Sequence, residues 1–127
     1  MEWILKNQFL YHVTSSEAAK EILNVGLTPR KIAGYFGEGG KFICLTTAKH
    51  INSYFDNQRE IILQIPISSL SLDSFCPDVT HALYNALVGT YKDDEIIQYM
   101  LNEYGTIGYF QPIPCSEIKI VPIEEVE

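Results

Sequence analysis

The alternation of apolar and polar residues divides the chain into short elements of both kinds. Residues 8–13 read QFLYHV, an apolar run of strand type that one histidine interrupts. Thr14 and Glu17 follow with the spacing of a capping box, and apolar positions then recur at helical spacing as far as Gly26. The pattern predicts a strand, a helix capped by Thr14, and a helix end at Gly26.

The next part of the chain alternates between flexible and apolar segments. Glycine and basic residues fill residues 28–41, so a loop is expected there. Residues 42–46 and 60–67 have the apolar character of strands. Between them Ile51 and Tyr54 recur at helical spacing, which predicts a short helix.

The last third of the chain contains its clearest helix. Residues 93–104 combine an acidic first turn with one apolar stripe. Residues 68–78 show no period and are expected to be irregular, and residues 81–88 have the pattern of a short helix. Residues 106–123 predict two strands or one broken strand.

Composition limits the fold class and the partners. With 127 residues and 46% hydrophobic content, the chain is expected to be a single α+β domain, residues 1–127, with an ordinary core. The net charge of −7 argues against a strongly basic groove for phosphates. Three cysteines without a CxxC pair predict no disulfide framework. No apolar run has the length of a membrane span or the form of a signal peptide, so a cytoplasmic protein without a membrane partner is expected.

Single residues point to chemistry only weakly. A lone histidine such as His12 is most often a core or edge residue bonded to a neighbour. Its place at a strand end, just before a helix N-terminus, also suits an anion or a ribose hydroxyl. The spacing of His12, His50 and His81 supports no metal site, and GEGG lacks the spacing of a dinucleotide fingerprint. Cys44, in the middle of a strand, is expected to be a small buried hydrophobe.

The order of these signals is more specific than any one of them. LYHVTS, a helix ending in ILNVGLTP, a glycine-rich loop and then GGKFICLTTAKHINSYF together resemble the ADP-ribosyltransferase superfamily. The resemblance is to its diphtheria-toxin-like and poly-ADP-ribose polymerase-like branch, and it covers residues 8–67 well and the remainder poorly. It implies an ADP-ribosyltransferase-like fold, with split mixed or antiparallel sheets and a few short helices, that takes NAD as its substrate.

The resemblance also implies a set of site residues. His12, beside Thr14, would hold the adenosine ribose, and Tyr54 would stack on the nicotinamide. Cys44 stands where this branch often has a tyrosine, so one wall of the nicotinamide site is missing or is supplied by Tyr35. The implied nucleotide-binding residues are His12, Thr14, Tyr35, Gly40, Cys44, Tyr54 and Gln111.

The catalytic glutamate is the least defined element of the resemblance. Asn102, Glu103 and Tyr104 are similar to the polymerase NEY motif, so Glu103 is the candidate catalytic residue beside His12 and Tyr54. Glu103 also falls in the last turn of the helix predicted over 93–104. If the following strand begins at Thr106, then Thr106 or Gly108 takes the place of the glutamate.

The implied activity is transfer of ADP-ribose from NAD to a protein or nucleic-acid acceptor, or hydrolysis of NAD. Such a protein would be a mono-ADP-ribosyltransferase, toxin-like or a stand-alone modifying enzyme, and it would need no metal. Two alternatives remain. One is a non-catalytic module on the same fold that binds a nucleotide or a protein. The other is an enzyme of the RNA 2′-phosphotransferase type, which also consumes NAD but normally has more basic residues and a separate N-terminal domain.

Overall fold

The computed structural model describes residues 8–34, 37–78, 87 and 89–126. Its strands are β1 (Phe9–Thr14), β2 (Arg30–Gly34), β3 (Gly37–Thr46), β4 (Ile61–Pro66), β5 (Phe75–Cys76), β6 (Thr106–Tyr109) and β7 (Lys119–Val121). The α-helices are α2 (Ser16–Val25) and α4 (Asp93–Tyr104). Short 3-10 helices are η1 (Ala48–Ser53), η2 (Ile67–Ser69), η3 (Leu72–Ser74), η4 (Cys115–Glu117) and η5 (Ile123–Glu125). Of the helix predicted over residues 81–88, only Leu87 lies within the described residues.

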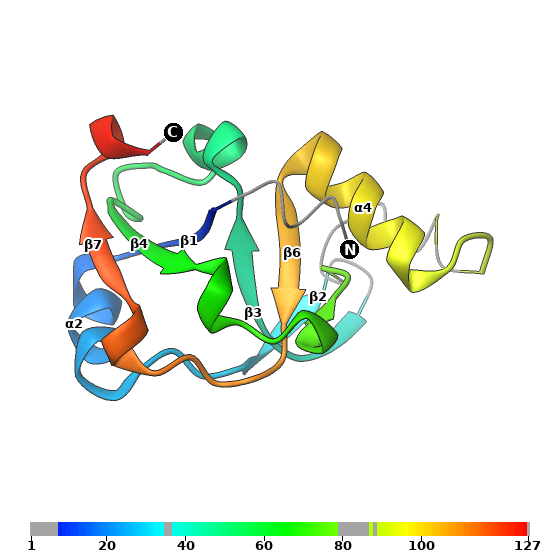
Figure 1. Cartoon of the computed structure of the whole chain (residues 1–127), viewed down its shortest axis with the longest axis horizontal. Helices are drawn as coiled ribbons and strands as arrows, with labels where there is room; N and C mark the ends of the chain where they lie inside the picture. The colour runs from blue at the N-terminus through cyan, green and yellow to red at the C-terminus, as the bar shows by residue number, and fades with distance from the viewer. Residues whose placement is uncertain (1–7, 35–36, 79–86, 88, 127) are drawn as a thin grey trace.

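The strands form one antiparallel sheet with the order β5-β6-β3-β1-β4-β7, and β2 pairs with β3 outside this path. The predicted α+β class is confirmed, with the described pairings antiparallel and not mixed. In Figure 1, β1 and β4 run across the direction of β3 and β6, so the sheet is bent in its middle. No helix in the described part of the chain has the length and apolar character needed to cross a membrane.

The bend lies where β1 diverges from β3. Strand β1 pairs with β4 along its whole length, from Phe9 opposite Pro66 to Thr14 opposite Ile61. Its register with β3 contains only Tyr11 opposite Thr46. The two halves of the sheet are therefore joined by a short stretch of pairing, and the residues of β1 after Tyr11 are not in register with β3.

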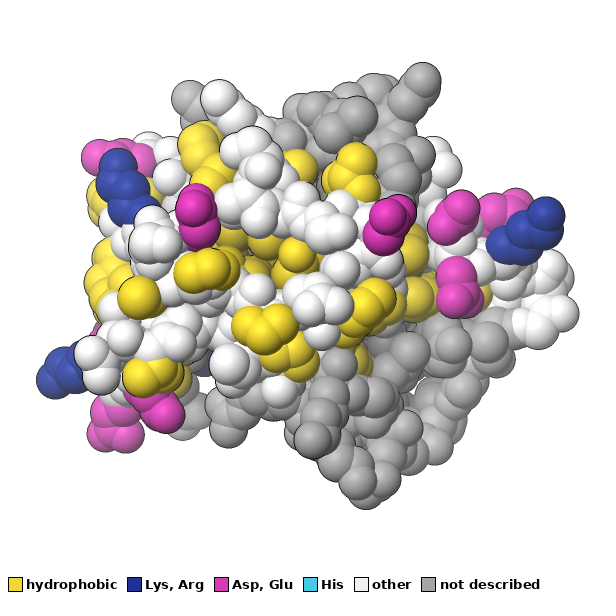
Figure 2. Space-filling view, turned by 60° about the horizontal axis from the view of Figure 1, so that its bottom comes forward, with side chains coloured by type: hydrophobic (Ala, Val, Ile, Leu, Met, Phe, Trp, Pro, Cys, Tyr) yellow, Lys and Arg dark blue, Asp and Glu magenta, His cyan; other side chains and the backbone are white. Residues whose placement is uncertain are grey.

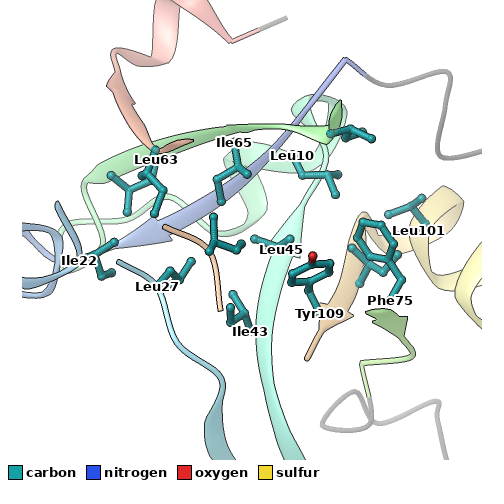
Figure 3. Packing of buried hydrophobic residues seen from close by; sticks show 14 of the residues in the cluster. Leu10, Ile22, Leu27, Ile43, Leu45, Leu63, Ile65, Phe75, Leu101 and Tyr109 are labelled. Carbon is teal, nitrogen blue, oxygen red and sulfur yellow. The ribbon is translucent and has the colours of Figure 1, made fainter. Parts of the chain in front are cut away.

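Buried side chains form two clusters on the two faces of the sheet. Leu10, Leu45 and Ile65 belong to the larger one, which Figure 3 shows between β1, β3 and β4 and extending to β6 and α4. Tyr11 and Ile62 belong to the smaller one, whose members are Tyr11, Ile51, Ile62 and Val121. Because side chains alternate along a strand, neighbouring residues of β1 serve different clusters.

Two local predictions are corrected by the structure. The helix N-cap is Ser15, whose hydroxyl accepts a hydrogen bond from the Ala18 backbone N–H at 3.2 Å, and not Thr14. Thr14 is still paired with Ile61 in β1, so the helix begins after it. The segment 28–41 is not a loop, because β2 and the first half of β3 form a hairpin there. In both segments, backbone pairing with a neighbouring strand determines the local structure. Local composition contains no information about such pairing.

The end of α4 is held against η1. Gly105 ends the helix with a φ of +67° and donates its N–H to the Leu101 carbonyl. Its own carbonyl accepts a bond from the Thr47 N–H at 3.2 Å. Thr47 Oγ1 and His50 Nδ1 are 3.1 Å apart, and the His50 ring lies where a side chain on Gly105 would point. This position therefore requires glycine for its backbone conformation and for the space above it.

Gly105→Ala should lower the free energy of unfolding by about 2–4 kcal/mol, because it adds left-handed backbone strain to a clash with the His50 ring. Urea denaturation monitored by circular dichroism measures the change. His50→Gly is the matched variant, because it removes the whole His50 side chain, Cβ included, so that only the backbone part, about 1 kcal/mol, should remain in that background. An equal loss in both backgrounds would contradict the contact.

Candidate functional site

The His12 side chain links β1 to β3 beyond the one residue pair that the two strands share. Its Nδ1 lies 2.9 Å from the Cys44 carbonyl oxygen. Since a carbonyl only accepts, Nδ1 carries the proton and donates it. Nε2 of the neutral ring is then a hydrogen-bond acceptor. The half-buried imidazole thus replaces backbone pairing at the point where the two strands separate.

Tyr54 follows η1 as its C-cap residue and is half-buried. Its hydroxyl donates to the Tyr104 carbonyl at 3.0 Å, which satisfies one of the free carbonyl groups at the end of α4. Burial raises the pKa of Tyr54, hydrogen bonding to Thr106 lowers it, and the nearby Asp78 and Cys44 raise it further. Cys44 thus bonds to His12 through its carbonyl, and its thiol is one of the groups that affect the Tyr54 hydroxyl.

Three adjacent strands bring two cysteines to either side of a glycine. Gly108 of β6 is in register with Cys44 of β3 and with Cys76 of β5. A Cβ added to Gly108 would lie 2.7 Å from Cys76 Sγ and 3.0 Å from Phe42 Cδ2. The neighbouring side chains thus occupy the space above the glycine, and a larger residue at this position would displace them.

A row of polar side chains crosses the same face. Thr106 stands opposite Thr46 in the β3–β6 register, and its Oγ1 donates to Asp78 Oδ2 at 2.7 Å. All three residues are buried, with exposed fractions of 3%, 4% and 7% for Thr106, Thr46 and Asp78. Thr46 Oγ1 has no hydrogen-bond partner among the described atoms. The Thr106 hydroxyl thus satisfies part of the hydrogen-bonding capacity of the buried Asp78 carboxylate.

Burial and this carboxylate keep both cysteines protonated. Desolvation, followed by the charge of Asp78 and the neighbouring Cys76, raises the pKa of Cys44 from 9.0 to about 12. Desolvation, then Asp78 and Asp93, raises the pKa of Cys76 to about 11. A thiol nucleophile needs a lowered pKa, so neither cysteine is suited to that role.

The other predicted site residues are distributed as follows. Thr14 is buried at the end of β1, and Gly40 lies in β3. Gln111 is exposed after β6. Glu103 is exposed in the last turn of α4, as its helical pattern predicted, and it directly precedes Tyr104. Tyr35 lies outside the described residues.

The structure thus connects His12 to Cys44, and Asp78 and Cys44 are among the groups that affect the pKa of Tyr54. Sequence patterns did not indicate Asp78, because it follows a strand of two residues in a segment that has no period. Thr106 was considered only as a substitute for a glutamate. Thr106 begins β6 near Tyr54, and its hydroxyl bonds to Asp78. A threonine at this strand start is therefore the only feature of the sequence that could have indicated Asp78.

The charged side chains visible on the face shown in Figure 2 do not form a basic groove. On the face shown in Figure 2, lysine and arginine side chains lie scattered at the rim among carboxylates. This agrees with the net charge of −7 and gives no support to non-specific binding of phosphate backbones. Within the described residues, no group of three or more His, Cys, Asp or Glu side chains could hold a metal ion.

Comparison of the chain with protein-family models, with curated proteins and with solved structures finds no match in any of the three.

The thiols predict a loss of stability at alkaline pH. The folded protein keeps the Cys44 and Cys76 protons up to about pH 12 and 11, whereas the unfolded chain releases them near pH 9. The folded state therefore binds more protons in this interval, and the free energy of unfolding should fall as the pH rises above 9. Urea denaturation between pH 7 and pH 10.5 measures the onset of this fall.

Alkylation provides a residue-specific check of the same prediction. Iodoacetamide labelling of the native protein, followed by mass spectrometry, should modify Cys44 more slowly than Cys115, which lies outside this face. Cys44→Ala should reduce the loss of stability at alkaline pH. Equally fast labelling of Cys44 and Cys115 at pH 8 would show that the thiol is not protected.

Proposed function

We propose that the chain is an NAD-binding protein of the ADP-ribosyltransferase type, which transfers ADP-ribose to a macromolecular acceptor or hydrolyses NAD. The observation that carries the proposal is the position of His12 at the place where β1 diverges from β3, held by the carbonyl of Cys44, whose thiol also acts on the Tyr54 hydroxyl. The bent antiparallel sheet is compatible with the split sheets of that fold.

Each side chain has a separate task in this proposal. The Cys44 carbonyl fixes His12 through Nδ1, so Nε2 is the nitrogen that accepts a hydrogen bond from a ribose hydroxyl. Tyr54 is fixed at its hydroxyl end by the Tyr104 carbonyl, which orients the ring that stacks on the nicotinamide. A ring held in place loses little conformational entropy when a ligand stacks on it.

The chemistry is substitution at C1′ of the nicotinamide ribose. The bond between C1′ and the nicotinamide nitrogen breaks, its electron pair goes to the ring, and nicotinamide leaves as a neutral molecule. Positive charge develops on the ribose in an oxocarbenium-like transition state, and the acceptor oxygen or nitrogen, or water, then bonds to C1′ and loses its proton to a base. A carboxylate near the ribose stabilises the developing charge.

Glu103 is proposed as the carboxylate that bonds a ribose hydroxyl and orients the acceptor. It precedes Tyr104, the residue whose carbonyl holds Tyr54, so its backbone borders the same site. Its exposed side chain is accessible to a macromolecule without displacement of the core.

A binding module without turnover is the second candidate function. The observation in its favour is that Thr106, and not a carboxylate, begins β6 on the face of Tyr54. In this case His12 and Tyr54 would bind the nucleotide in the same way, and nicotinamide would not be released.

His12→Ala should weaken NAD binding by about two- to tenfold, corresponding to the net value of about 0.5–1.5 kcal/mol for one hydrogen bond. It should also lower the free energy of unfolding by a similar amount, because the bond to the Cys44 carbonyl is lost. Isothermal titration with NAD and thermal denaturation measure the two effects.

Val13→Ala is the matched control for His12→Ala. Val13 is the next residue of β1 and packs against the smaller cluster, so its truncation should lower stability and leave NAD affinity unchanged. If His12→Ala behaves in the same way as Val13→Ala, then His12 is a structural residue and the proposal loses its main support.

Glu103→Gln should lower the rate of nicotinamide release by on the order of 10²-fold while NAD affinity stays within a few-fold. The reason is that the carboxylate interacts mainly with charge that exists only in the transition state. Nicotinamide release measured by chromatography, beside an NAD titration, separates the two quantities.

Glu21→Gln, at an exposed position of α2, is the control for the change of one surface charge. Equal release by wild type and Glu103→Gln would remove Glu103 from the mechanism. NAD binding without release by the wild type would favour the binding module over the enzyme.

A further inference from the structure

The surface of α4 carries an aromatic pair that the core does not use. The buried side chains of this helix are Ile96, Ile97, Met100 and Leu101. Outside that face, Tyr99 keeps 44% of its surface exposed, and Tyr104 in the last position of the helix keeps 36%. Single exposed aromatic side chains are common in folded proteins, but these two form a ring pair. The pair is therefore a feature of the surface and not of the packing beneath it.

The two rings form an edge-to-face pair. Their centroids are 6.3 Å apart, and the ring planes are inclined by 63°. The face of a tyrosine ring is electron-rich, so it attracts a cation that lies within about 6 Å of the ring centroid. Because both residues are exposed, a cation can approach the pair from solvent.

The backbone at the end of α4 holds this pair in place. The Tyr104 carbonyl accepts the hydrogen bond from the Tyr54 hydroxyl at 3.0 Å. The next residue, Gly105, ends the helix, and its carbonyl accepts a bond from the Thr47 N–H. The Tyr104 backbone is thus fixed by the two residues that flank η1, and a ligand that binds the ring pair orders little of the chain.

Two carboxylates accompany Tyr99 along the helix. Glu95 and Glu103 stand four residues before and after it, so all three side chains lie on one side of α4. Both carboxylates are exposed, and neither forms an ion pair in the part of the chain that the structure describes. One oxygen of Glu95 accepts the Lys92 backbone N–H. Between Lys92 and Tyr104 the chain has four carboxylates and one lysine, so this surface carries a net negative charge.

An aromatic pair beside carboxylates selects the charge of its partner. The surface attracts cations and repels nucleic acids and anionic lipid headgroups. It also repels a second copy of this chain, whose net charge is −7. An arginine guanidinium is planar, so it stacks on an aromatic ring and bonds both oxygens of one carboxylate, whereas a lysine ammonium is a strongly hydrated point charge. Arginine therefore fits this surface better than lysine.

We propose that Tyr99, Tyr104 and Glu103 bind an arginine side chain from a basic segment of a partner protein. One cation at an exposed site gains little affinity, so further positive charges of the same segment are needed. Asp93 and Asp94 are exposed in the first turn of α4 and can attract them. The inference does not require NAD binding or turnover, because it concerns a partner other than the nucleotide.

The experiment compares two peptides of equal charge, hexa-arginine and hexalysine. Each is titrated into the isotopically labelled protein at about 150 mM salt, where distant surface charges are screened. Wild type should bind hexa-arginine about two- to fivefold tighter than hexalysine, as expected for one cation–π contact at an exposed site. The amide shifts should be concentrated between Glu95 and Tyr104.

Substitutions at Tyr99 test the role of the ring. Tyr99→Ala should remove the preference for arginine, whereas Tyr99→Phe, which keeps the ring, should retain it. Phe110→Ala is the matched control, because Phe110 is an aromatic residue outside α4 with 45% of its surface exposed. Its affinities for both peptides should equal those of wild type.

Equal binding of the two peptides by the wild type would overturn the inference, even if Tyr99→Ala does not fold. Amide shifts spread over the carboxylates of the whole chain would overturn it too, because only the net charge would then attract the peptide. The same holds if Phe110→Ala loses the preference as Tyr99→Ala does. Free arginine that produces the same shifts as hexa-arginine, at equal guanidinium concentration, would identify a small cation and not a protein segment as the ligand. NAD binding is measured separately and is unaffected by any of these results.

Discussion

The divergence of β1 from β3 determines how the two halves of the sheet are arranged. On one side, the β1 backbone pairs with β4 along its whole length. On the other side, its pairing with β3 is limited to Tyr11 and Thr46. Beyond this residue pair, the hydrogen bond from His12 to the Cys44 carbonyl links β1 to β3. Because the sheet bends at this place, a half-buried polar ring lies at the junction between the two halves, where a continuous sheet would have backbone pairing.

The polar face beside this junction is arranged around a buried charge. Thr46, Thr106 and Asp78 occupy positions that apolar side chains would fill with less loss of solvation. Two thiols on the same face remain protonated, so their burial does not add further charge. Polar groups in such an arrangement stabilise the fold only when they bond to one another, as Thr106 and Asp78 do.

The two carboxylates near Tyr54 have different environments. Glu103 is exposed in the last turn of α4 and precedes Tyr104, whose carbonyl holds Tyr54. Asp78 is buried and accepts a hydrogen bond from Thr106. In the proposed function, exposure therefore assigns the contact with the acceptor to Glu103, whereas Asp78 belongs to the packed interior beside the sheet.

The sequence by itself determined the elements with a strong local pattern. The helix over 93–104, the strand over 60–67 and the α+β class follow from periodicity, because one buried face imposes that period. It also indicated His12 and Tyr54. Only the tertiary structure decided that β2 forms a hairpin with β3, and that Asp78 lies beside Thr106. Both depend on strands that are distant or very short in sequence, and contacts of this kind leave no period in the chain.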